Sequence, residues 1–420
     1  MKFKKVCVVG LGYIGLPTAA LMASRGLEVV GVDINESVVD SVNRGAVHIV
    51  EPRLDAVVQA AVGSGRLRAA PRPETADAFL IAVPTPITAD KASDMRAVLS
   101  AVDAIAPVLK AGDLVVLEST SPVGTTDIIN QRMAAARPDL RFPKVGVDGP
   151  DVHVAYCPER VLPGKVIQEL VSNDRAIGGM TEACTELATG LYALFVEGEL
   201  VATRAREAEL CKLAENAFRD VNIAYANELA NVCDSQGVDV WEVIRLANRH
   251  PRVNILNPGP GVGGHCIAVD PWFIVESAPD DTPVIQAARA VNDGRPHRVV
   301  EKIRVMVEGL RSPVVACLGL AFKPDIDDLR ESPAVDVVLE VARLPGVELL
   351  VVEPNINQLP AHIRAAGAEL VDLETALSRA DAVAVLVDHT PFRQNVDRIA
   401  AKDRIVDTRG ILSRTVSAVL

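Results

Sequence analysis

Short, almost uninterrupted apolar runs alternate with helical segments in two stretches of this 420-residue chain. The first 130 residues contain KKVCVVG, LEVVGVD, DAFLIAVPTP and GDLVVLEST, and the region from about residue 313 contains PVVACLGLAF, VELLVVEPN, ADAVAVLVDH and DRIVDTRG. Strands this apolar are typical of parallel sheets that helices cover on both faces. The sequence therefore predicts an α/β fold with two Rossmann-like, doubly wound parallel-sheet domains. The two series correspond in order, through either duplication or shared strand chemistry.

A segment from Arg204 to about Gln236 lies between the two series and contains neither Gly nor Pro. It is rich in Ala, Leu, Asn and Glu, so it predicts one long central helix that joins the domains, or two shorter helices with a break. We expect an NAD-binding domain at 1–203, a central helical domain with the cysteine loop at 204–300, and a second Rossmann-like domain at 301–420. The long helix is also a candidate dimer surface.

Composition excludes several classes of protein. Lys and Arg number 43 against 55 Asp and Glu, and this net charge of −12 argues against a nucleic-acid or anionic-membrane partner. The seven cysteines are dispersed without a C-x-x-C pair, which predicts no disulfide framework and no metal site and fits a cytoplasmic protein. The uncharged stretch from Cys7 to Ser24 is interrupted by three glycines and Pro17, so it predicts neither a signal peptide nor a membrane span.

Gly10-Leu-Gly12-Tyr-Ile-Gly15 follows the first predicted strand and begins a predicted helix, and Asp33 ends the next strand. This context is typical of dinucleotide binding, because the glycines allow a tight turn and close approach of a pyrophosphate to the helix N-terminus. Asp33 would accept hydrogen bonds from the adenosine ribose and repel a 2′-phosphate, which favours NAD over NADP. A glycine-rich turn without a ligand is the alternative.

Two threonines follow later apolar strands of the first series. Thr85 and Thr120 would lie beyond the carboxyl ends of these strands, where open parallel sheets bind ligands. They are candidates for the nicotinamide region or ordinary loop residues.

The segment from Pro258 to Cys266 contains four glycines and two prolines within eight residues. It predicts a tight loop that holds an anion or brings the Cys266 thiol to a substrate. Such a thiol needs activation by a cation or a base, and Asp270 is placed to position water or a lysine. A buried, inert cysteine is the alternative.

Further polar residues recur at helical and loop positions. Lys212, Asn216 and Arg219 share one face of the long helix, either as a solvated stripe or with the lysine near a reacting oxygen and the arginine near phosphate. In the second series, Lys323 follows a degraded glycine turn. With Arg330 and Arg409 it is a candidate for holding a diphosphate, and scattered surface charges are the alternative.

These segments together resemble the UDP-glucose/GDP-mannose dehydrogenase family over nearly the full length. The resemblance is carried by GLGYIGLPTA, YCPERVLPG, AELCKLAENAFRDVNIA, PGPGVGGHCIAVDPW and LGLAFKPDIDDLRESPA. It implies NAD-dependent, four-electron oxidation of the C6 alcohol of a UDP-sugar to a carboxylate. Cys266 would capture the intermediate aldehyde as a thiohemiacetal, a second hydride transfer would give a thioester, and water would hydrolyse it.

The resemblance also implies roles for individual residues. Lys212 and Asn216 would stabilise the developing oxyanion, and Asp270 would support the lysine and the water. Glu159 would act as a base, with Thr120 placing the water. The implied contacts of the nucleotide sugar are Arg160, Val161, Lys212, Asn216, Arg219, His250, Arg252, Gly263, Phe322, Lys323 and Arg409. The implied contacts of NAD are Gly10, Gly12, Tyr13, Ile14, Gly15, Asp33, Thr85, Thr126 and Arg330.

Three further segments bear on the substrate: HIVEP at 48–52, ANRHPRVNIL at 247–256, and His265 before Cys266. They are most similar to family members that oxidise UDP-N-acetyl-D-mannosamine. Members acting on UDP-glucose often have NPSFGYGG where this chain has NPGPGVGG, and this difference leaves room for an N-acetyl group. We expect a UDP-N-acetylhexosamine substrate. UDP-N-acetylmannosamine is the leading candidate, and UDP-N-acetylglucosamine and UDP-glucose are the alternatives. The expected role is the synthesis of precursors for a surface polysaccharide.

In relatives the loop arginine reaches the neighbouring subunit, so a homodimer is expected, with a tetramer as the larger option. Two other functions remain open on the residues alone. One is a two-electron dehydrogenase in which Cys266 has no role, and the other is an inactive sensor that binds NAD and a nucleotide sugar.

Overall fold

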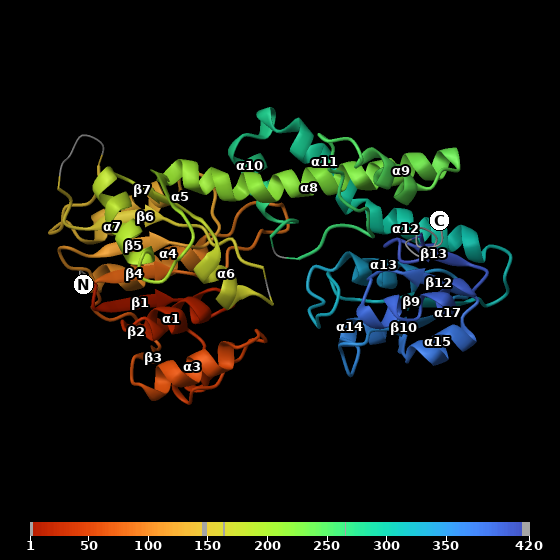
Figure 1. Cartoon of the computed structure of the whole chain (residues 1–420), viewed down its shortest axis with the longest axis horizontal. Helices are drawn as coiled ribbons and strands as arrows, with labels where there is room; N and C mark the ends of the chain where they lie inside the picture. The colour runs from red at the N-terminus through yellow and green to blue at the C-terminus, as the bar shows by residue number, and fades with distance from the viewer. Residues whose placement is uncertain (1–2, 145–148, 163, 265, 414–420) are drawn as a thin grey trace. The chain divides into compact units, whose positions relative to one another are not determined.

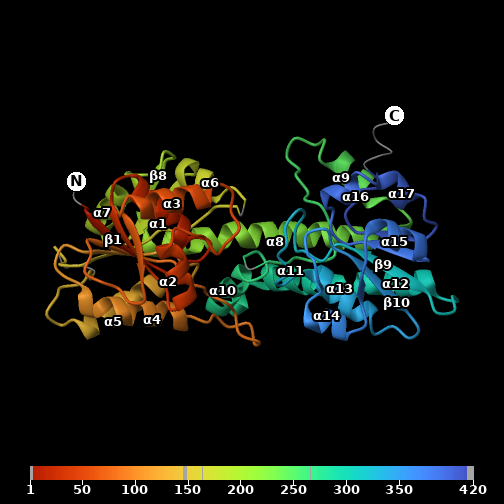
Figure 2. The same ribbon diagram turned by 90° about the horizontal axis from the view of Figure 1, so that it is seen from below.

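The computed structural model describes residues 3–144, 149–162, 164–264 and 266–413, so His265 of the glycine loop lies outside the described residues. The chain forms two compact units, Met1–Glu215 with Trp272–Pro279, and Asn216–Pro271 with Asp280–Leu420 (Figures 1 and 2). Each unit contains its own sheet, and the long helix α8 (Ala205–Gln236) contributes residues to both. The expected fold class and the unbroken central helix are confirmed. The predicted domain boundaries at 203/204 and 300/301 stay predictions.

The first unit is built on an eight-stranded sheet with the order β3-β2-β1-β4-β5-β6-β7-β8. Its strands are β1 (Lys5–Val9), β2 (Glu28–Val32), β3 (Leu67–Ala70), β4 (Ala78–Ile81), β5 (Leu114–Leu117), β6 (His153–Tyr156), β7 (Arg175–Gly179) and β8 (Leu200–Arg204). All neighbours pair in parallel except β6 and β7, which are antiparallel. The apolar pattern predicted buried strands here but carries no information about strand direction.

Helices cover both faces of this sheet. They are α1 (Gly15–Ser24), α2 (Glu36–Asn43), α3 (Leu54–Gly63), α4 (Arg96–Ile105), α5 (Thr125–Ala136), α6 (Val166–Ser172) and α7 (Glu182–Tyr192), with a 3₁₀ turn at Ala106–Val108. Side chains of β1 alternate between two buried apolar clusters: Val6 and Val8 belong to one, and Cys7 and Val9 to the other. The continuous apolar run of β1 therefore follows from burial on both faces.

The second unit contains a five-stranded, wholly parallel sheet with the order β11-β10-β9-β12-β13. Its strands are β9 (Val314–Leu318), β10 (Glu348–Val352), β11 (Glu369–Leu370), β12 (Ala382–Val385) and β13 (Ile405–Asp407). Its helices are α9 (Val240–Ala247), α11 (Pro283–Asp293), α12 (Arg295–Val307), α13 (Pro333–Val341), α14 (Ala361–Ala365), α15 (Leu373–Arg379), α16 (Thr390–Arg393) and α17 (Val396–Ala400). Helix α10 (Asp270–Ser277) and a 3₁₀ turn at Pro279–Asp281 complete the chain's helical segments.

The first turn of each sheet has the same backbone geometry. Gly10 has a φ of 94° and donates its N–H to the carbonyl of Val32 at 2.8 Å. Gly319 has a φ of 95° and donates to the carbonyl of Val352 at 2.8 Å. The correspondence between the two series of the sequence is therefore present in the structure as the same strand–turn arrangement.

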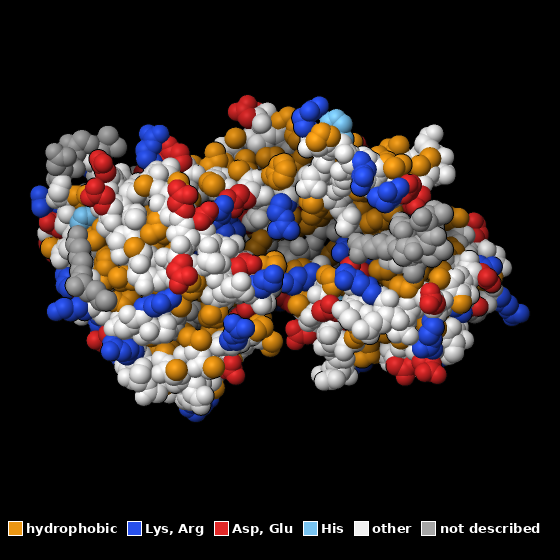
Figure 3. Space-filling view, viewed as in Figure 1, with side chains coloured by type: hydrophobic (Ala, Val, Ile, Leu, Met, Phe, Trp, Pro, Cys, Tyr) orange, Lys and Arg blue, Asp and Glu red, His pale blue; other side chains and the backbone are white. Residues whose placement is uncertain are grey.

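The surface carries charges of both signs, and Figure 3 shows Lys and Arg interspersed with Asp and Glu on the face in view. Within the part of the chain that the structure describes, no helix has the length and apolar character needed to cross a bilayer. The seven cysteines all lie among the described residues and none is assigned to a disulfide, with Cys211 and Cys266 exposed.

Candidate active site

The glycine-rich turn of the first unit connects β1 to α1. A Cβ at Gly10 would lie 2.4 Å from the carbonyl oxygen of Ala82, and a Cβ at Gly15 would lie 1.8 Å from that of Gly10. The fold itself therefore requires both of these glycines. A Cβ at Gly12 would meet nothing within 4 Å, so packing does not explain this glycine. The open space over Gly12 fits the close approach of a pyrophosphate.

Asp33 lies at the end of β2, beside the same turn. Its Oδ2 accepts the N–H of Leu11 at 3.0 Å, and its Oδ1 accepts the N–H of Asn35 at 2.9 Å. Each carboxylate oxygen has a second lone pair for a ribose hydroxyl. No side chain caps α1 at Ile14, but the N–H of Leu16 donates to the carbonyl of Gly12 at 3.2 Å and Pro17 has no N–H, so this end of the helix offers chiefly its dipole to a phosphate. With the half-exposed Tyr13, these residues fit NAD.

Ser119 joins the loops that follow β4 and β5. Its hydroxyl donates to the carbonyl of Val83 at 2.8 Å and accepts the N–H of Val83 at 2.9 Å. Thr85 and Thr120 lie on these two loops, and both are half-buried at the carboxyl edge of the sheet. Sequence reasoning missed Ser119, whose one signal is its place directly before Thr120.

Thr126 lies at the start of α5 and forms hydrogen bonds with Glu209 of α8. Its hydroxyl donates to Oε1 of Glu209 at 2.6 Å and its N–H donates to the same atom at 2.8 Å. The N–H of Gly124 donates to Oε2 of Glu209 at 2.6 Å. Burial raises the pKa of Glu209 from its ordinary value. The Thr126 hydroxyl therefore faces a protein carboxylate, and its contact with NAD stays a prediction.

The loop after β6 holds Glu159 in a buried position. Its Oε2 accepts the N–H of Val161 at 2.5 Å, and its Oε1 lies 3.6 Å from Nη1 of the buried Arg175. Arg160 forms a two-point ion pair with Glu215 of α8, at 3.1 Å from Nε and 2.5 Å from Nη2. The structure thus turns the Arg160 guanidinium toward α8, and its contact with a substrate stays a prediction.

Three of the predicted catalytic residues meet in the second unit. Asn216 of α8 donates from Nδ2 to Oδ2 of Asp270 at 2.6 Å, and both side chains are buried. The backbone carbonyl of Cys266 accepts the N–H of Asp270 at 2.8 Å, while the Cys266 residue is exposed. Lys212, which is half-buried, lies one helical turn before Asn216 along α8. Arg219, farther along α8, is exposed.

The glycine loop lies directly against the connection between β9 and α13. A Cβ at Gly263 would be 2.5 Å from the carbonyl oxygen of Glu331, and a Cβ at Gly264 would be 3.1 Å from the Phe322 ring. A Cβ at Gly259 would be 2.9 Å from Nη1 of Arg409. The loop is rich in glycine because its backbone approaches these groups so closely. The structure therefore brings Gly263 and Gly264 to Phe322, and Gly259 to Arg409.

The predicted cations of the second unit differ in their surroundings. Nε of Arg409 donates to Oδ1 of Asp388 at 3.0 Å, which holds its side chain in place. Arg330 forms a two-point ion pair with Asp328, at 2.9 and 2.7 Å. The remaining predicted contacts are the half-buried Lys323 beside Phe322, and the exposed His250 and Arg252 after α9.

Glu353 ends β10, where Asp33 ends β2 in the first unit. Its Oε2 accepts the N–H groups of Leu320 and Ala321 at 2.7 and 3.1 Å and lies 3.0 Å from Nε2 of His389. The side chains of Glu353 and His389 are fully buried. Because the fold itself uses this acid, the turn of the second unit cannot offer it to a ribose as the first unit offers Asp33.

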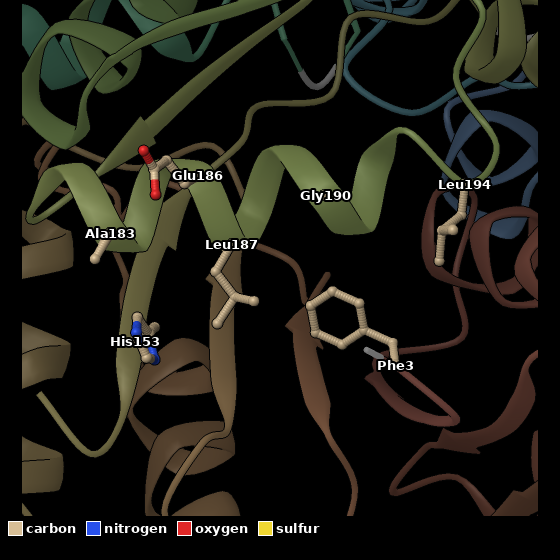
Figure 4. Close-up of a pocket in the computed structure, with 7 residues that line it drawn as sticks. All are labelled: Phe3, His153, Ala183, Glu186, Leu187, Gly190 and Leu194. Carbon is tan, nitrogen blue, oxygen red and sulfur yellow. The ribbon is translucent and has the colours of Figure 1, made fainter. Parts of the chain in front are cut away.

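A separate cavity of about 270 Å³ lies in the first unit (Figure 4). It is lined by Phe3, His153, Ala183, Glu186, Leu187, Gly190 and Leu194. Phe3 precedes β1 and His153 begins β6, so this cavity lies at the amino ends of parallel strands, opposite to the glycine turn. Its lining shares no residue with the predicted site, and ligands of such sheets bind at the other edge.

Comparison with known proteins agrees with this arrangement. Three domain models of the UDP-glucose/GDP-mannose dehydrogenase family match in order: the NAD binding domain at residues 4–196, the central domain at 206–294 and the UDP binding domain at 316–414. The chain is 58% identical, over 412 residues, to an NDP-N-acetyl-D-galactosaminuronic acid dehydrogenase of Ralstonia nicotianae, covering 98% of this chain and 97% of that protein.

Two further relatives point the same way. A UDP-N-acetyl-D-mannosamine dehydrogenase of Yersinia pestis is 57% identical over 419 residues, which cover 98% of this chain and 100% of the relative. The solved structure of a UDP-D-ManNAc dehydrogenase from Pyrococcus horikoshii is 37% identical and has a TM-score of 0.86, with coverage of 97% and 96%. The predicted family and an NAD-binding domain are confirmed. The chain is an NAD-dependent oxidoreductase that belongs to the UDP-glucose/GDP-mannose dehydrogenase family.

Proposed function

We propose that this protein oxidises the C6 alcohol of UDP-N-acetyl-D-mannosamine to the uronate in two NAD-dependent steps. The observation that carries this proposal is the placement of Cys266, exposed at the end of a glycine loop that lies against Phe322 and Arg409, with the buried Asn216–Asp270 pair beside it. An exposed thiol next to buried polar groups suits covalent capture of an aldehyde. Relatives named for this activity, at 57% identity, support the choice of sugar.

The proposed chemistry uses the chain's own residues as follows. NAD, bound at the Gly10–Gly15 turn, supplies the hydride acceptor for both oxidations. The C6 alcohol first loses a hydride and its hydroxyl proton, which gives an aldehyde. The Cys266 sulfur then adds to the C6 aldehyde carbon, and the thiol proton passes to the aldehyde oxygen to give a thiohemiacetal. Loss of a hydride and a proton then leaves a thioester, while Lys212 and Asn216 stabilise the developing oxyanion.

Hydrolysis of the thioester completes the reaction. Water attacks the thioester carbon, its proton passes to the Glu159 carboxylate, and the Cys266 sulfur leaves and is reprotonated. Thr120 positions this water, and Asp270 holds Asn216 through their hydrogen bond. Arg160, Val161, Arg219, His250, Arg252, Gly263, Phe322, Lys323 and Arg409 hold the nucleotide sugar, and Thr85, Thr126 and Arg330 contribute to NAD binding.

A second candidate substrate is a UDP-sugar of the N-acetylgalactosamine type. The 58% identity to a relative named NDP-N-acetyl-D-galactosaminuronic acid dehydrogenase favours it. Sequence reasoning considered UDP-N-acetylglucosamine and UDP-glucose but not this sugar. All the amino sugars share the acetamido group and the C6 alcohol, so they differ only in the orientation of ring hydroxyl or acetamido groups.

The test is a panel of UDP-N-acetylmannosamine, UDP-N-acetylgalactosamine, UDP-N-acetylglucosamine and UDP-glucose with NAD. NADH release and acid product are measured for each sugar. We expect two NADH per molecule of UDP-N-acetylmannosamine and the highest kcat/KM for this sugar. A higher kcat/KM for the galacto sugar would replace the first candidate with the second, and one NADH per sugar would contradict the four-electron mechanism.

We further propose a cytoplasmic homodimer that supplies precursors of a surface polysaccharide. Exposed apolar residues recur on α8 at intervals of seven or eight, namely Leu210, Phe218, Tyr225 and Val232. Residues spaced in this way share one face of a helix, and a second copy of α8 is a partner of matching shape. Cysteines outside disulfides are typical of a reducing compartment and support this location.

A further inference from the structure

A buried charged cluster lies next to Glu159 in the first unit. Glu118 follows β5, Arg175 begins β7, and Tyr192 ends α7. The exposed fractions are 4% for Glu118, 1% for Arg175, 0% for Tyr192 and 8% for Glu159. Charged residues are seldom buried to this extent without a specific partner. Sequence reasoning did not identify Glu118, Arg175 or Tyr192.

The contacts of this cluster converge on Arg175. Its Nη1 lies 3.6 Å from Oε1 of Glu159 and 3.5 Å from the carbonyl oxygen of Pro158, to which it donates. Its guanidinium carbon lies 5.8 Å from the centre of the Tyr192 ring. The Tyr192 hydroxyl donates to Oε1 of Glu118 at 2.5 Å. Arg175 therefore holds both the backbone and the carboxylate of the loop that carries Glu159.

The cluster is also incompletely satisfied. Among the described residues, Glu118 Oε2, Glu159 Oε1 and Arg175 Nε are buried side-chain atoms without a hydrogen-bond partner. The charges of Glu118 and Glu159 both interact with the single guanidinium of Arg175, so with both carboxylates ionised the cluster would carry one uncompensated negative charge. Leaving buried polar atoms unpaired costs stability, and a fold that keeps them calls for an explanation beyond packing.

We propose that Glu118 and Arg175 are positioning residues for Glu159. Arg175 orients the Glu159 carboxylate, and the ionised form of Glu118 competes for the same positive charge, so that Arg175 holds Glu159 less firmly once Glu118 has lost its proton. This inference rests on the proposed role of Glu159 as the base.

Glu118 and the titratable groups around it differ in whether their charge changes near neutral pH. Burial raises the pKa of Glu118 itself to about 7, although Arg175 and Tyr192 oppose this shift. Burial raises the pKa of the Cys157 thiol, which follows β6, to about 12. Burial also raises the pKa of Tyr192 well above its ordinary value. Glu118 is therefore the member of the Glu118–Cys157–Arg175–Tyr192 group whose charge changes around pH 7.

The test compares the pH dependence of kcat in the full-length wild-type enzyme and in Glu118→Gln. The amide keeps the shape of the side chain and can still accept the Tyr192 hydrogen bond. Because the competing charge is present only above the pKa of Glu118, at about 7, the kcat of the wild-type enzyme should fall by about threefold relative to that of Glu118→Gln as the pH rises through 7. A second variant, Arg175→Lys, keeps the positive charge but has a shorter side chain. We expect its kcat to fall about tenfold while the KM values for NAD and for the UDP-sugar stay within about twofold.

Asp113→Asn is the matched control. Asp113 is a buried carboxylate at the opposite end of β5, where it pairs with Lys110 at 2.5 Å, and burial raises its pKa as well. Its loss should leave the change in kcat around pH 7 as it is in the wild-type enzyme. The same fall in Glu118→Gln as in the wild-type enzyme, or the absence of that fall in Asp113→Asn, would overturn the inference.

A second readout separates this inference from the proposed function. If the wild-type enzyme released no NADH from any sugar in the panel, the proposed function would fail. Carbon-13 NMR titration of the glutamate carboxyls then tests the cluster directly, with the Glu159 signal assigned from Glu159→Gln. We expect the Glu159 signal of the wild-type protein to shift as the pH rises through 7 and that of Glu118→Gln to stay in place, and the same behaviour in both proteins would reject the positioning pair.

Discussion

At the scale of single residues, the proposed role of Cys266 distinguishes a four-electron oxidation from a two-electron one. A hydroxyl in its place is a much weaker nucleophile toward an aldehyde at neutral pH, and an ester would form less readily than a thioester. The chain offers a control in Cys211, the other exposed cysteine, which lies on α8 with its sulfur 3.6 Å from Oε1 of Glu215.

We therefore expect Cys266→Ser to lower turnover by about a thousandfold while the affinity for the UDP-sugar stays within about twofold. Cys211→Ser should turn over like the wild-type enzyme. NADH release and isothermal titration calorimetry measure the two quantities. Wild-type turnover in Cys266→Ser would contradict covalent catalysis.

Glu118 also makes a prediction about stability. Its pKa is raised from 4.5 to about 7 by burial, so the folded protein holds a proton there that the unfolded chain has lost. Between these two pH values the folded state binds more protons than the unfolded state, and stability must therefore fall as the pH rises. The loss is at most on the order of 3 kcal/mol, since one pKa unit corresponds to about 1.4 kcal/mol. Thermal unfolding of Glu118→Gln should show a flatter dependence between pH 5 and pH 7, and an equal slope in both proteins would disprove this coupling.

At the scale of elements, the turn between β1 and α1 contains glycines that serve different purposes. Gly15 is required by packing, because a Cβ would lie 1.8 Å from a backbone oxygen. Gly12 has open space around it, so the fold does not explain its glycine, and we attribute it to the proposed approach of NAD. This contrast makes the two positions separable by experiment.

We expect Gly15→Ala to destabilise the protein by about 2 kcal/mol or more, because backbone atoms must shift. Gly12→Ala should unfold within about 2 °C of the wild-type Tm but bind NAD about tenfold more weakly, since the methyl group occupies the place of the pyrophosphate. Calorimetric unfolding and NAD titration check both expectations. Unchanged NAD binding in Gly12→Ala would remove the ligand-based explanation of this glycine.

At the scale of the whole molecule, the exposed apolar face of α8 predicts self-association. Phe218 is 68% exposed and Tyr225 is 55% exposed at the centre of this helix. Burying such side chains against a second copy is favourable by about 25 cal/mol per Å² of apolar surface. The same face in a permanent monomer would be an unusual exposed patch.

Sedimentation should therefore give twice the 44.6-kDa mass of one chain for the wild-type protein. Phe218→Asp should shift the equilibrium toward the monomer, because a charge would be buried in the interface. Val305→Asp is the matched control, since Val305 of α12 is 58% exposed and lies outside this face. A wild-type monomer, or an equal effect of both substitutions, would contradict dimer formation through α8.

Features that depend on neighbouring residues along the chain could be predicted from the amino-acid sequence. Apolar runs specified the strands, and the absence of Gly and Pro specified α8. The spacing of Gly10, Gly12 and Gly15 specified the NAD turn, because each acts within a few residues of the others. Contacts between residues that are distant in the sequence form only in the folded chain, so the sequence did not predict them. Glu118 and Tyr192 are 74 positions apart in the sequence and Gly124 and Glu209 are 85 apart, so no local pattern pairs them. The antiparallel pairing of β7 with β6 also follows from packing, because strand direction has no signature in neighbouring residues. The same holds for Glu353, whose carboxylate contacts the N–H of Leu320 and the ring of the distant His389.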